Sequence, residues 1–479
     1  MKNSKLIQLL SMLTSRELTR FEDYVYSPFF NKHNELRKLC SYLIKQAPEF
    51  RQERKLHKER IYKHLYGAKP FDNNMFYSLF SKLLKLLHEF LIHIEWQQWE
   101  RQQQIFLMRE LRKRLQFRHQ AVAQKRYEQA AKPNYVEDLY LEEYWLHKEL
   151  DLQFVTKGGR VYDSNLQQKN DYLDLFYITE KLKTACDMIN RNTIIGTDYQ
   201  YPLLEELLVH IKKVPQYAEL PVIKIYQLIL NLLLKPDEET IYADLIQFVV
   251  EHNNSFSDED LRAVYIYALN YCATRINKGQ IRYYKESLYL YKQLLGRRLI
   301  YVDGYLPAGH YKNILTTAVR TKDFEWAEEF IEERKKDLAP SIRENSYRYN
   351  LAFFHHATHQ YDKALQALHN VDFVNLSYAL GAKIIQIKSY YELDEYEALL
   401  SAIEAFTVFL RRSKKIAAYQ RQANLNFLKL TGRLCKLREQ VGIISNKKYE
   451  HKYEELKKGL LELNPVANKD WLENCLNAL

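Results

Sequence analysis

Three short stretches decide the fold of this chain: Phe324-Glu325-Trp326-Ala327, Tyr361-Asp362-Lys363-Ala364-Leu365 and Tyr396-Glu397-Ala398-Leu399. Their leading aromatic residues lie 37 and then 35 positions apart. A period in this range is typical of helical hairpins that bury a continuous core only against their neighbours. The sequence therefore predicts an all-α fold, with an N-terminal helical module followed by α-α hairpins stacked into a superhelix, or solenoid.

The composition agrees with helices rather than sheets. The chain has 479 residues but only 12 Gly and 11 Pro, whereas average usage would give roughly 57 of the two together. The 38 tyrosines suit helix interfaces, because a tyrosine ring packs while its hydroxyl reaches water. A β-rich fold is disfavoured, and the length exceeds what one hydrophobic core usually serves.

The cysteines and the N-terminal residues indicate in which cellular compartment the protein is expected. The five cysteines are widely separated and form no C-x-x-C pair, which disfavours a disulfide framework and a zinc ribbon. No secretion signal is recognisable in residues 1–17, and the apolar stretch 222–234 is too short to cross a bilayer. We therefore expect a cytoplasmic protein that does not insert into membranes.

Helix start and stop signals divide the chain. Thr14 with Glu17 forms a capping box, and Asp72 precedes a long helix that ends near Trp96. Ser341 with Glu344 has the spacing of another capping box. These marks predict a basic N-terminal helical module over 1–98, a basic connecting helix over 99–134, and a helical-repeat array with C-terminal capping helices over 135–479.

The repeats resemble the tetratricopeptide pattern. In the best copy, Leu351 and Ala352 lie on the first helix, and Tyr361, Ala364 and Leu368 lie on the second. The usual Trp and Gly of the first helix are replaced by Arg348 and Ala352. The resemblance covers about 308–410 and implies a superhelix with a concave binding face.

The whole chain is also similar to a group of bacterial helical-repeat proteins. The stretches that carry this likeness are Ser27-Pro28-Phe29-Phe30-Asn31-Lys32 and Ala268-Leu269-Asn270-Tyr271-Cys272. The resemblance implies no activity.

The sequence motifs that would indicate catalysis, metal binding or phosphate binding are weak. His355 and His359 have the spacing of one helical turn, but the zincin motif needs Glu where His356 stands, so solvated histidines are favoured over a metal site. Lys157-Gly158-Gly159-Arg160 lacks the remainder of a phosphate-binding loop and reads as a hairpin turn. We therefore expect no catalytic residues, no metal and no cofactor.

The favoured hypothesis is a non-catalytic adaptor that binds a protein or peptide on the concave face. Side chains expected to face a partner combine contact area with hydrogen bonding. They are Arg348, Asn350, His355 and His359 on the first helix of the best repeat, and Lys388 on the next first helix.

The alternative hypothesis is an RNA- or DNA-associated protein. Residues 1–132 hold 26 Lys and Arg against 13 Asp and Glu, while residues 133–479 hold 45 against 47. Residues 58–82 also contain a helix-turn-helix-like unit, although its turn is longer than DNA-reading motifs allow. The expected contacts with phosphates are Arg109, Arg112, Lys113, Arg114, Arg118, Arg411 and Arg412. An acidic protein surface would satisfy the same charge.

Overall fold

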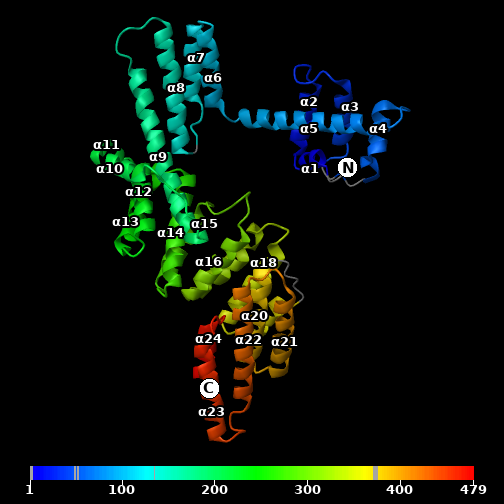
Figure 1. The fold of residues 1–479 in the computed structure, drawn as a ribbon, viewed down its shortest axis with the longest axis vertical. Coiled ribbons are helices and arrows are strands. Elements are labelled where there is room, and N and C mark those ends of the chain that lie inside the picture. Colours follow the sequence, from blue (N-terminus) through cyan, green and yellow to red (C-terminus); the bar gives the residue numbers. More distant parts are fainter. Residues whose placement is uncertain (1–3, 48–49, 51–52, 134, 370–375) are drawn as a thin grey trace. The chain divides into compact units, whose positions relative to one another are not determined.

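The computed structural model describes residues 4–47, 50, 53–133, 135–369 and 376–479, and it is all-helical (Figure 1). Within these residues there are 24 α-helices and no strand, only one isolated bridge between Val302 and Tyr305. The predicted all-α class is confirmed. The chain separates into two compact units, residues 1–180 and 181–479. The predicted division at 98 and 134 stays a prediction.

Unit 1 begins with a small helical module that has its own core. The side chains of Phe21, Leu39, Ile61, Leu83 and Leu87 are fully buried in that core. Its helices are α1 (Lys5–Leu10), α2 (Ser15–Tyr26), α3 (Asn34–Ile44), α4 (Lys58–Tyr66) and α5 (Asn73–Trp96).

The module's helices begin where the sequence predicts. Thr14 and Glu17 form the capping box of α2, and the Asp72 side chain accepts a hydrogen bond from the Met75 backbone at 3.0 Å. Each cap satisfies backbone N–H groups that have no partner within the helix. The apolar stripe of α5 then packs against α1, α2 and α3.

The single basic helix expected between residues 99 and 134 is two helices. They are α6 (Glu100–Lys113) and α7 (Phe117–Gln129), which pack on each other, and α8 (Val136–Thr156) packs on α6. Leu115 has a φ of 57°, a left-handed conformation that interrupts a helix. The apolar residues on either side of this break have the spacing of one continuous helical stripe, so the sequence predicted a single helix.

Unit 2 is a succession of helical pairs. Helix α9 (Ser164–Ile195) leads into it from unit 1. The next helices are α10 (Leu204–Lys213), α11 (Pro215–Ala218), α12 (Pro221–Leu234), α13 (Glu239–Glu251), α14 (Asp258–Asn277), α15 (Tyr283–Gly296), α16 (Ala308–Arg320) and α17 (Phe324–Arg334). The last are α18 (Arg343–Ala357), α19 (Tyr361–Leu368), α20 (Leu376–Glu392), α21 (Tyr396–Arg412), α22 (Ala418–Glu439), α23 (Asn446–Glu462) and α24 (Lys469–Asn477).

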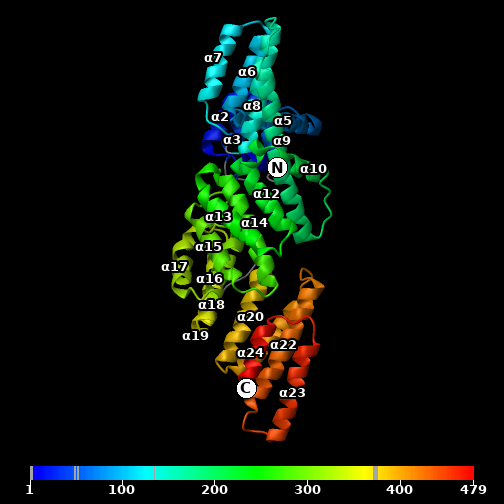
Figure 2. The same cartoon turned by 90° about the vertical axis from the view of Figure 1, so that its left-hand side faces the viewer.

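Helix α12 packs on α13 and on α14, and from α14 onward each helix packs on the next, so that α12 with α13, α14 with α15, and the later pairs up to α22 with α23 form hairpins. First helices also meet one another, since α16 packs on α18 and α18 on α20. The small residues of the repeats lie at these contacts: Ala318, Ala327, Ala352 and Ala364 are all fully buried. Figure 2 shows the last helices, α22, α23 and α24, side by side.

The start of α18 departs from the prediction. The helix begins at Arg343, Ile342 precedes it, and no side chain caps it. The Glu344 carboxylate instead pairs with Lys335 at 3.2 Å and with Arg348 at 2.7 Å. The predicted Ser341–Glu344 capping box is therefore wrong, because stronger charged partners hold the glutamate.

Close approach of α18 and α20 depends on one glycine. A Cβ atom built on Gly381 would lie 2.4 Å from the Tyr349 hydroxyl oxygen and under 3 Å from its ring. The two first helices therefore meet at a point where only glycine fits.

Candidate functional site

The predicted contact residues of α18 have different surroundings. The Arg348 side chain is 40% exposed and its Nε donates to Glu344. Asn350 is fully buried, and its amide nitrogen donates to the Ser346 carbonyl at 2.7 Å. In this conformation Arg348 is accessible to a partner, whereas Asn350 is closed off because its face of the helix turns into the protein.

His355 and His359 do not form a helical pair. Helix α18 ends at Ala357, and His359 follows with a φ of 60°. The His359 ring nitrogen Nδ1 lies 2.7 Å from the Tyr361 hydroxyl, while His355 is half-buried and has a lowered pKa, chiefly through burial. Among the described residues, no group of three or more His, Cys, Asp or Glu side chains gathers as a metal site.

Lys388 on α20 lies beneath the C-terminal helix. Its Nζ donates to the Asn468 side-chain oxygen at 2.8 Å and lies 5.3 Å from the centre of the Trp471 ring. Burial, followed by the nearby charge of Arg320, lowers the pKa of Lys388 to about 8. Holding a charged lysine in a buried place costs free energy, and an anionic group nearby would offset that cost.

His356 was missed as a site residue. Its Nδ1 lies 3.2 Å from the Ser389 hydroxyl of α20, and burial followed by the charge of Lys388 lowers its pKa to about 4. The sequence carried one signal for this placement: His356 stands seven positions after the buried Tyr349, on the same face of a helix.

Two first helices, α16 and α20, contribute cationic groups to one surface, on either side of α18. Lys312 of α16 lies over the rings of Tyr349 and Tyr378, 5.3 and 5.9 Å from their centres, and burial lowers its pKa. We call this surface the first-helix face and define it by Lys312, Arg320, Tyr349, His356 and Lys388.

Helix α24 covers part of the surface of α20 and α22, next to the first-helix face. The Trp471 indole nitrogen donates to Glu392 at 3.1 Å, and its ring contacts Tyr391 of α20 and Phe427 of α22 at centroid distances of 5.2 and 5.9 Å. The segment before the helix is held as well, since the Ala467 N–H donates to the Ala423 carbonyl at 3.0 Å. The chain thus lays its own last helix across α20 and α22.

Most of the basic residues predicted as phosphate contacts on 99–134 have carboxylate partners within unit 1. Arg109 and Arg112 both pair with the buried Glu149, at 2.9 and 3.0 Å. Lys113 and Arg114 pair with Glu110 at 2.7 and 2.5 Å. Arg118 is exposed. Four of the five phosphate contacts predicted on 99–134 therefore already have carboxylate partners. The pairing with Glu149 of α8 depends on how α8 packs on α6, which the sequence alone does not give.

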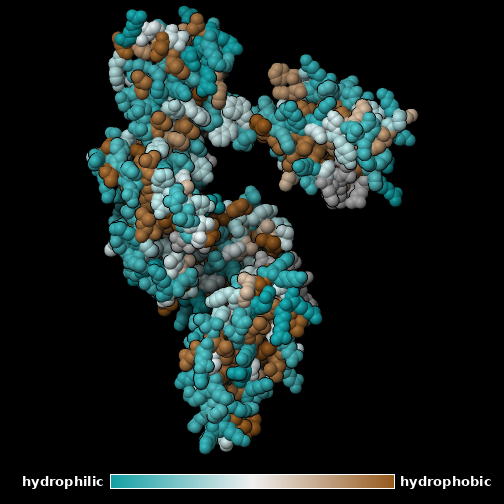
Figure 3. All heavy atoms as spheres, in the orientation of Figure 1, coloured by the Kyte–Doolittle hydropathy of each residue, from teal (hydrophilic) through white to brown (hydrophobic). Residues whose placement is uncertain are grey.

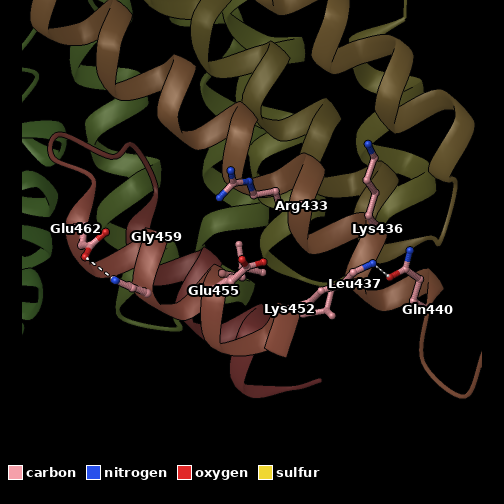
Figure 4. A pocket seen from close by; sticks show the side chains of 10 residues that line it. Arg433, Lys436, Leu437, Gln440, Lys452, Glu455, Gly459 and Glu462 are labelled. Atoms are coloured by element: carbon pink, nitrogen blue, oxygen red, sulfur yellow. Dashed lines mark hydrogen bonds and ion pairs between the residues drawn. The ribbon is translucent and has the colours of Figure 1, made fainter. Parts of the chain in front are cut away.

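A second basic region lies near the C-terminus, and four of its cations have no ion-pair partner in the part of the chain that the structure describes. Arg411 and Arg412 at the end of α21 are exposed, as are Arg433 and Lys436 on α22. A groove of about 540 Å³ runs between α22 and α23 (Figure 4). We call it the α22–α23 groove, and its lining residues are Arg433, Lys436, Leu437, Gln440, Lys452, Glu455, Leu456, Lys458, Gly459 and Glu462. Figure 3 shows a mainly hydrophilic surface at this end of unit 2.

The five cysteines, Cys40, Cys186, Cys272, Cys435 and Cys475, are all buried and unpaired. Burial is the main cause that raises the pKa of each thiol, to about 11 for Cys272 and Cys435 and about 12 for Cys475. Because the thiolate is the reactive form, these surroundings are those of core packing rather than of a nucleophile.

The fold defines an all-helical protein built in large part from consecutive helical pairs. Comparison with protein-family models, with curated proteins and with solved structures finds no match to this chain. Across the described residues, no helix combines the length and the apolar character needed to cross a bilayer.

Proposed function

We propose that this protein is a non-catalytic scaffold whose tetratricopeptide-like repeats, within 135–479, wind into a superhelix and bind a segment of another protein. The pairing of consecutive helices supports the repeat arrangement, as do the contacts of α16 with α18 and of α18 with α20. Stacking of this kind gives first helices a shared inner face. The binding surface in this proposal is the first-helix face.

The observation that carries the proposal is the position of α24. A short amphipathic helix already lies on the first helices α20 and α22, with Trp471 as an aromatic anchor and Lys388 as a polar contact to Asn468. Helices recognised in grooves use the same combination of apolar anchors and flanking polar contacts. The exposed continuation of this surface over α16 and α18 would receive the partner.

The partner segment should carry acidic side chains. Arg320 is exposed, and Lys388 and Lys312 have pKa values lowered mainly by burial. A carboxylate placed among them would form charge-assisted hydrogen bonds and relieve the cost of holding these cations together.

Site-specific photo-crosslinking in the full-length protein tests the proposal. A photoreactive residue at Thr316, one turn before Arg320 on α16, should capture a protein partner in a lysate of the source cells. The same residue at the exposed Glu404 of α21 is the control and should capture none. Arg320→Glu should abolish capture at Thr316, whereas Lys285→Glu, the same charge change on α15, should leave it intact. Equal capture at both positions, or none at either, would remove the proposal.

We favour the nucleic-acid alternative at α6 less, because four of the basic residues expected to bind phosphates there are paired with Glu110 or Glu149. The exposed positions of the helix-turn-helix-like unit, such as Asn74 and Tyr77, are accessible, but Phe71 and Phe76 are in ring contact at 5.8 Å at the start of α5. The proposal for this chain therefore rests on the first-helix face.

A further inference from the structure

Residues 411–458 concentrate positive charge to an unusual degree. They hold 14 Lys and Arg against 4 Asp and Glu, and they span the end of α21, all of α22 and most of α23. Nine of these cations are exposed and have no ion-pair partner among the described residues: Arg411, Arg412, Lys414, Lys415, Lys429, Arg433, Lys436, Lys447 and Lys448. Their mutual repulsion is uncompensated in the free protein, so binding of a polyanion here is favoured.

One face of α22 orders part of this charge into a line. Lys429, Arg433 and Lys436 follow one another at helical spacing, and Tyr419 lies in the first turn of the same helix, about 80° around its axis from Lys429. The Tyr419 ring is 71% exposed. Tyr419 and Lys436 lie about 25 Å apart along the axis of α22. We call the surface that carries Lys429, Arg433 and Lys436 the α22 basic face.

The α22–α23 groove continues the α22 basic face sideways. Lys452 and Lys458 of α23 add two more cations to its lining, against the carboxylates of Glu455 and Glu462 (Figure 4). Lys458 and Glu462 lie 3.7 Å apart and both are well exposed. Gly459 has no side chain to fill the groove beside Arg433. A Cβ atom built on Gly459 would lie 3.7 Å from the NH1 atom of Arg433.

We propose that the α22 basic face and the α22–α23 groove bind single-stranded nucleic acid. Lysine and arginine side chains in a line neutralise successive phosphates and release their counterions. The exposed Tyr419 at the start of the same helix provides a platform for a base, which is the usual second component of single-strand binding. This site lies apart from the first-helix face and does not depend on the proposed function.

An acidic protein would satisfy the charge less well. Protein interfaces draw most of their affinity from aromatic or apolar anchors in desolvated pockets. The apolar side chains that line the groove, Leu437 and Leu456, are only 2% and 5% exposed, so they offer little surface to a partner. The elongated, polar and cationic surface matches a phosphate backbone.

Fluorescence anisotropy of the full-length protein with labelled 20-mers of single-stranded DNA and RNA, at 25 to 200 mM salt, tests the inference. The logarithm of the affinity should fall linearly with the logarithm of the salt concentration. The triple variant Lys429→Gln/Arg433→Gln/Lys436→Gln should lower the magnitude of that slope by about 2, since each phosphate contact contributes about 0.7. If affinity at 1 M salt is unchanged, the loss at 0.1 M is about 100-fold.

The matched control is Lys212→Gln/Lys213→Gln/Lys224→Gln, which removes three exposed cations from α10 and α12 of the same unit and should bind like the parent. Tyr419→Ala should weaken binding about tenfold and Tyr419→Phe should not, because stacking needs only the ring. Circular dichroism melts of every variant verify folding.

Three results would overturn the inference. They are no binding at 25 mM salt, an equal loss in the α10–α12 control, and tighter binding to poly-glutamate or to vesicles with phosphatidylserine than to the oligonucleotides.

Discussion

At the scale of single residues, Arg101 lies at the centre of a network of polar groups buried in unit 1. Arg101 is 4% exposed; its Nε donates to Glu142 at 2.6 Å and its NH2 to Glu143 at 2.7 Å. The guanidinium also lies 3.8 Å from the centre of the Tyr127 ring. Burial raises the pKa of Glu142 in spite of its cationic partner, which shows how much this carboxylate depends on Arg101.

Replacing Arg101 should therefore destabilise unit 1 strongly. Arg101→Ala leaves Glu142 buried without its partner, and we expect a loss of about 3 to 5 kcal/mol. Hydrogen exchange of the α6 and α8 amides measures the free energy of opening. Lys113→Ala, which breaks the exposed pair with Glu110, should cost no more than about 1 kcal/mol; similar losses in both variants would contradict this account.

His356 predicts a particular dependence of stability on pH. Its pKa is lowered from 6.5 to about 4 in the folded protein, first by burial. Between pH 6.5 and 4 the unfolded chain binds the proton and the folded chain does not, so the stabilising contribution of the neutral imidazole is lost as the pH falls through this window. Above pH 6.5 this contribution no longer changes with pH.

The variant His356→Gln can still hydrogen-bond Ser389 but does not titrate. Urea unfolding at pH 7, 5.5 and 4.5 should show a smaller loss of stability on acidification for this variant than for the parent. His451→Gln, at an exposed position on α23, is the control. A parent and variant with parallel pH profiles would show that the imidazole is not excluded from protonation.

At the scale of helices, the contact between α18 and α20 sets a sharp test. Gly381→Ala would force a methyl group into the Tyr349 ring, at contacts of 2.4 to 2.9 Å, and overpacking of this kind costs about 1 to 3 kcal/mol. The control is Gly432→Ala in α22, where a Cβ atom would meet nothing closer than 3.9 Å.

The two substitutions should have opposite signs. Alanine stabilises a helix interior by about 1 kcal/mol relative to glycine, so Gly432→Ala should raise the midpoint of urea unfolding while Gly381→Ala lowers it. Tyr349→Leu should recover part of the loss in the Gly381→Ala background. If Gly381→Ala were also stabilising, the tight approach of α18 to α20 would be wrong.

Helix positions could be predicted from the sequence because their signals are local. Thr14 with Glu17 and Asp72 mark helix starts that the structure confirms. The break at Leu115 was missed because no Gly or Pro marks it, and the Ser341–Glu344 box failed because Lys335 and Arg348 compete for the carboxylate. Competition among charged side chains depends on tertiary positions that spacing does not give.

At the scale of the whole molecule, the distribution of charge shows the same limit. Residues 133–479 are nearly balanced in total, and this average concealed the basic segment 411–458, which a shorter window would have found. Conversely, four of the basic residues in 99–132 pair with Glu110 and Glu149. The candidate residues near the first-helix face were located by helix facing alone, so Asn350, buried on the opposite side of its helix, could not be separated from Arg348.

The buried thiols give each region of the chain its own reporter. Cys40 lies in α3, Cys186 in α9, Cys272 in α14, Cys435 in α22 and Cys475 in α24. An alkylating reagent can modify each one only when its surroundings open, so pulse labelling followed by peptide mass spectrometry should yield five separate rates. If the pairs open independently from the end of the array, Cys475 will be alkylated first and Cys272 later, whereas one shared rate would mean that the entire chain opens in concert.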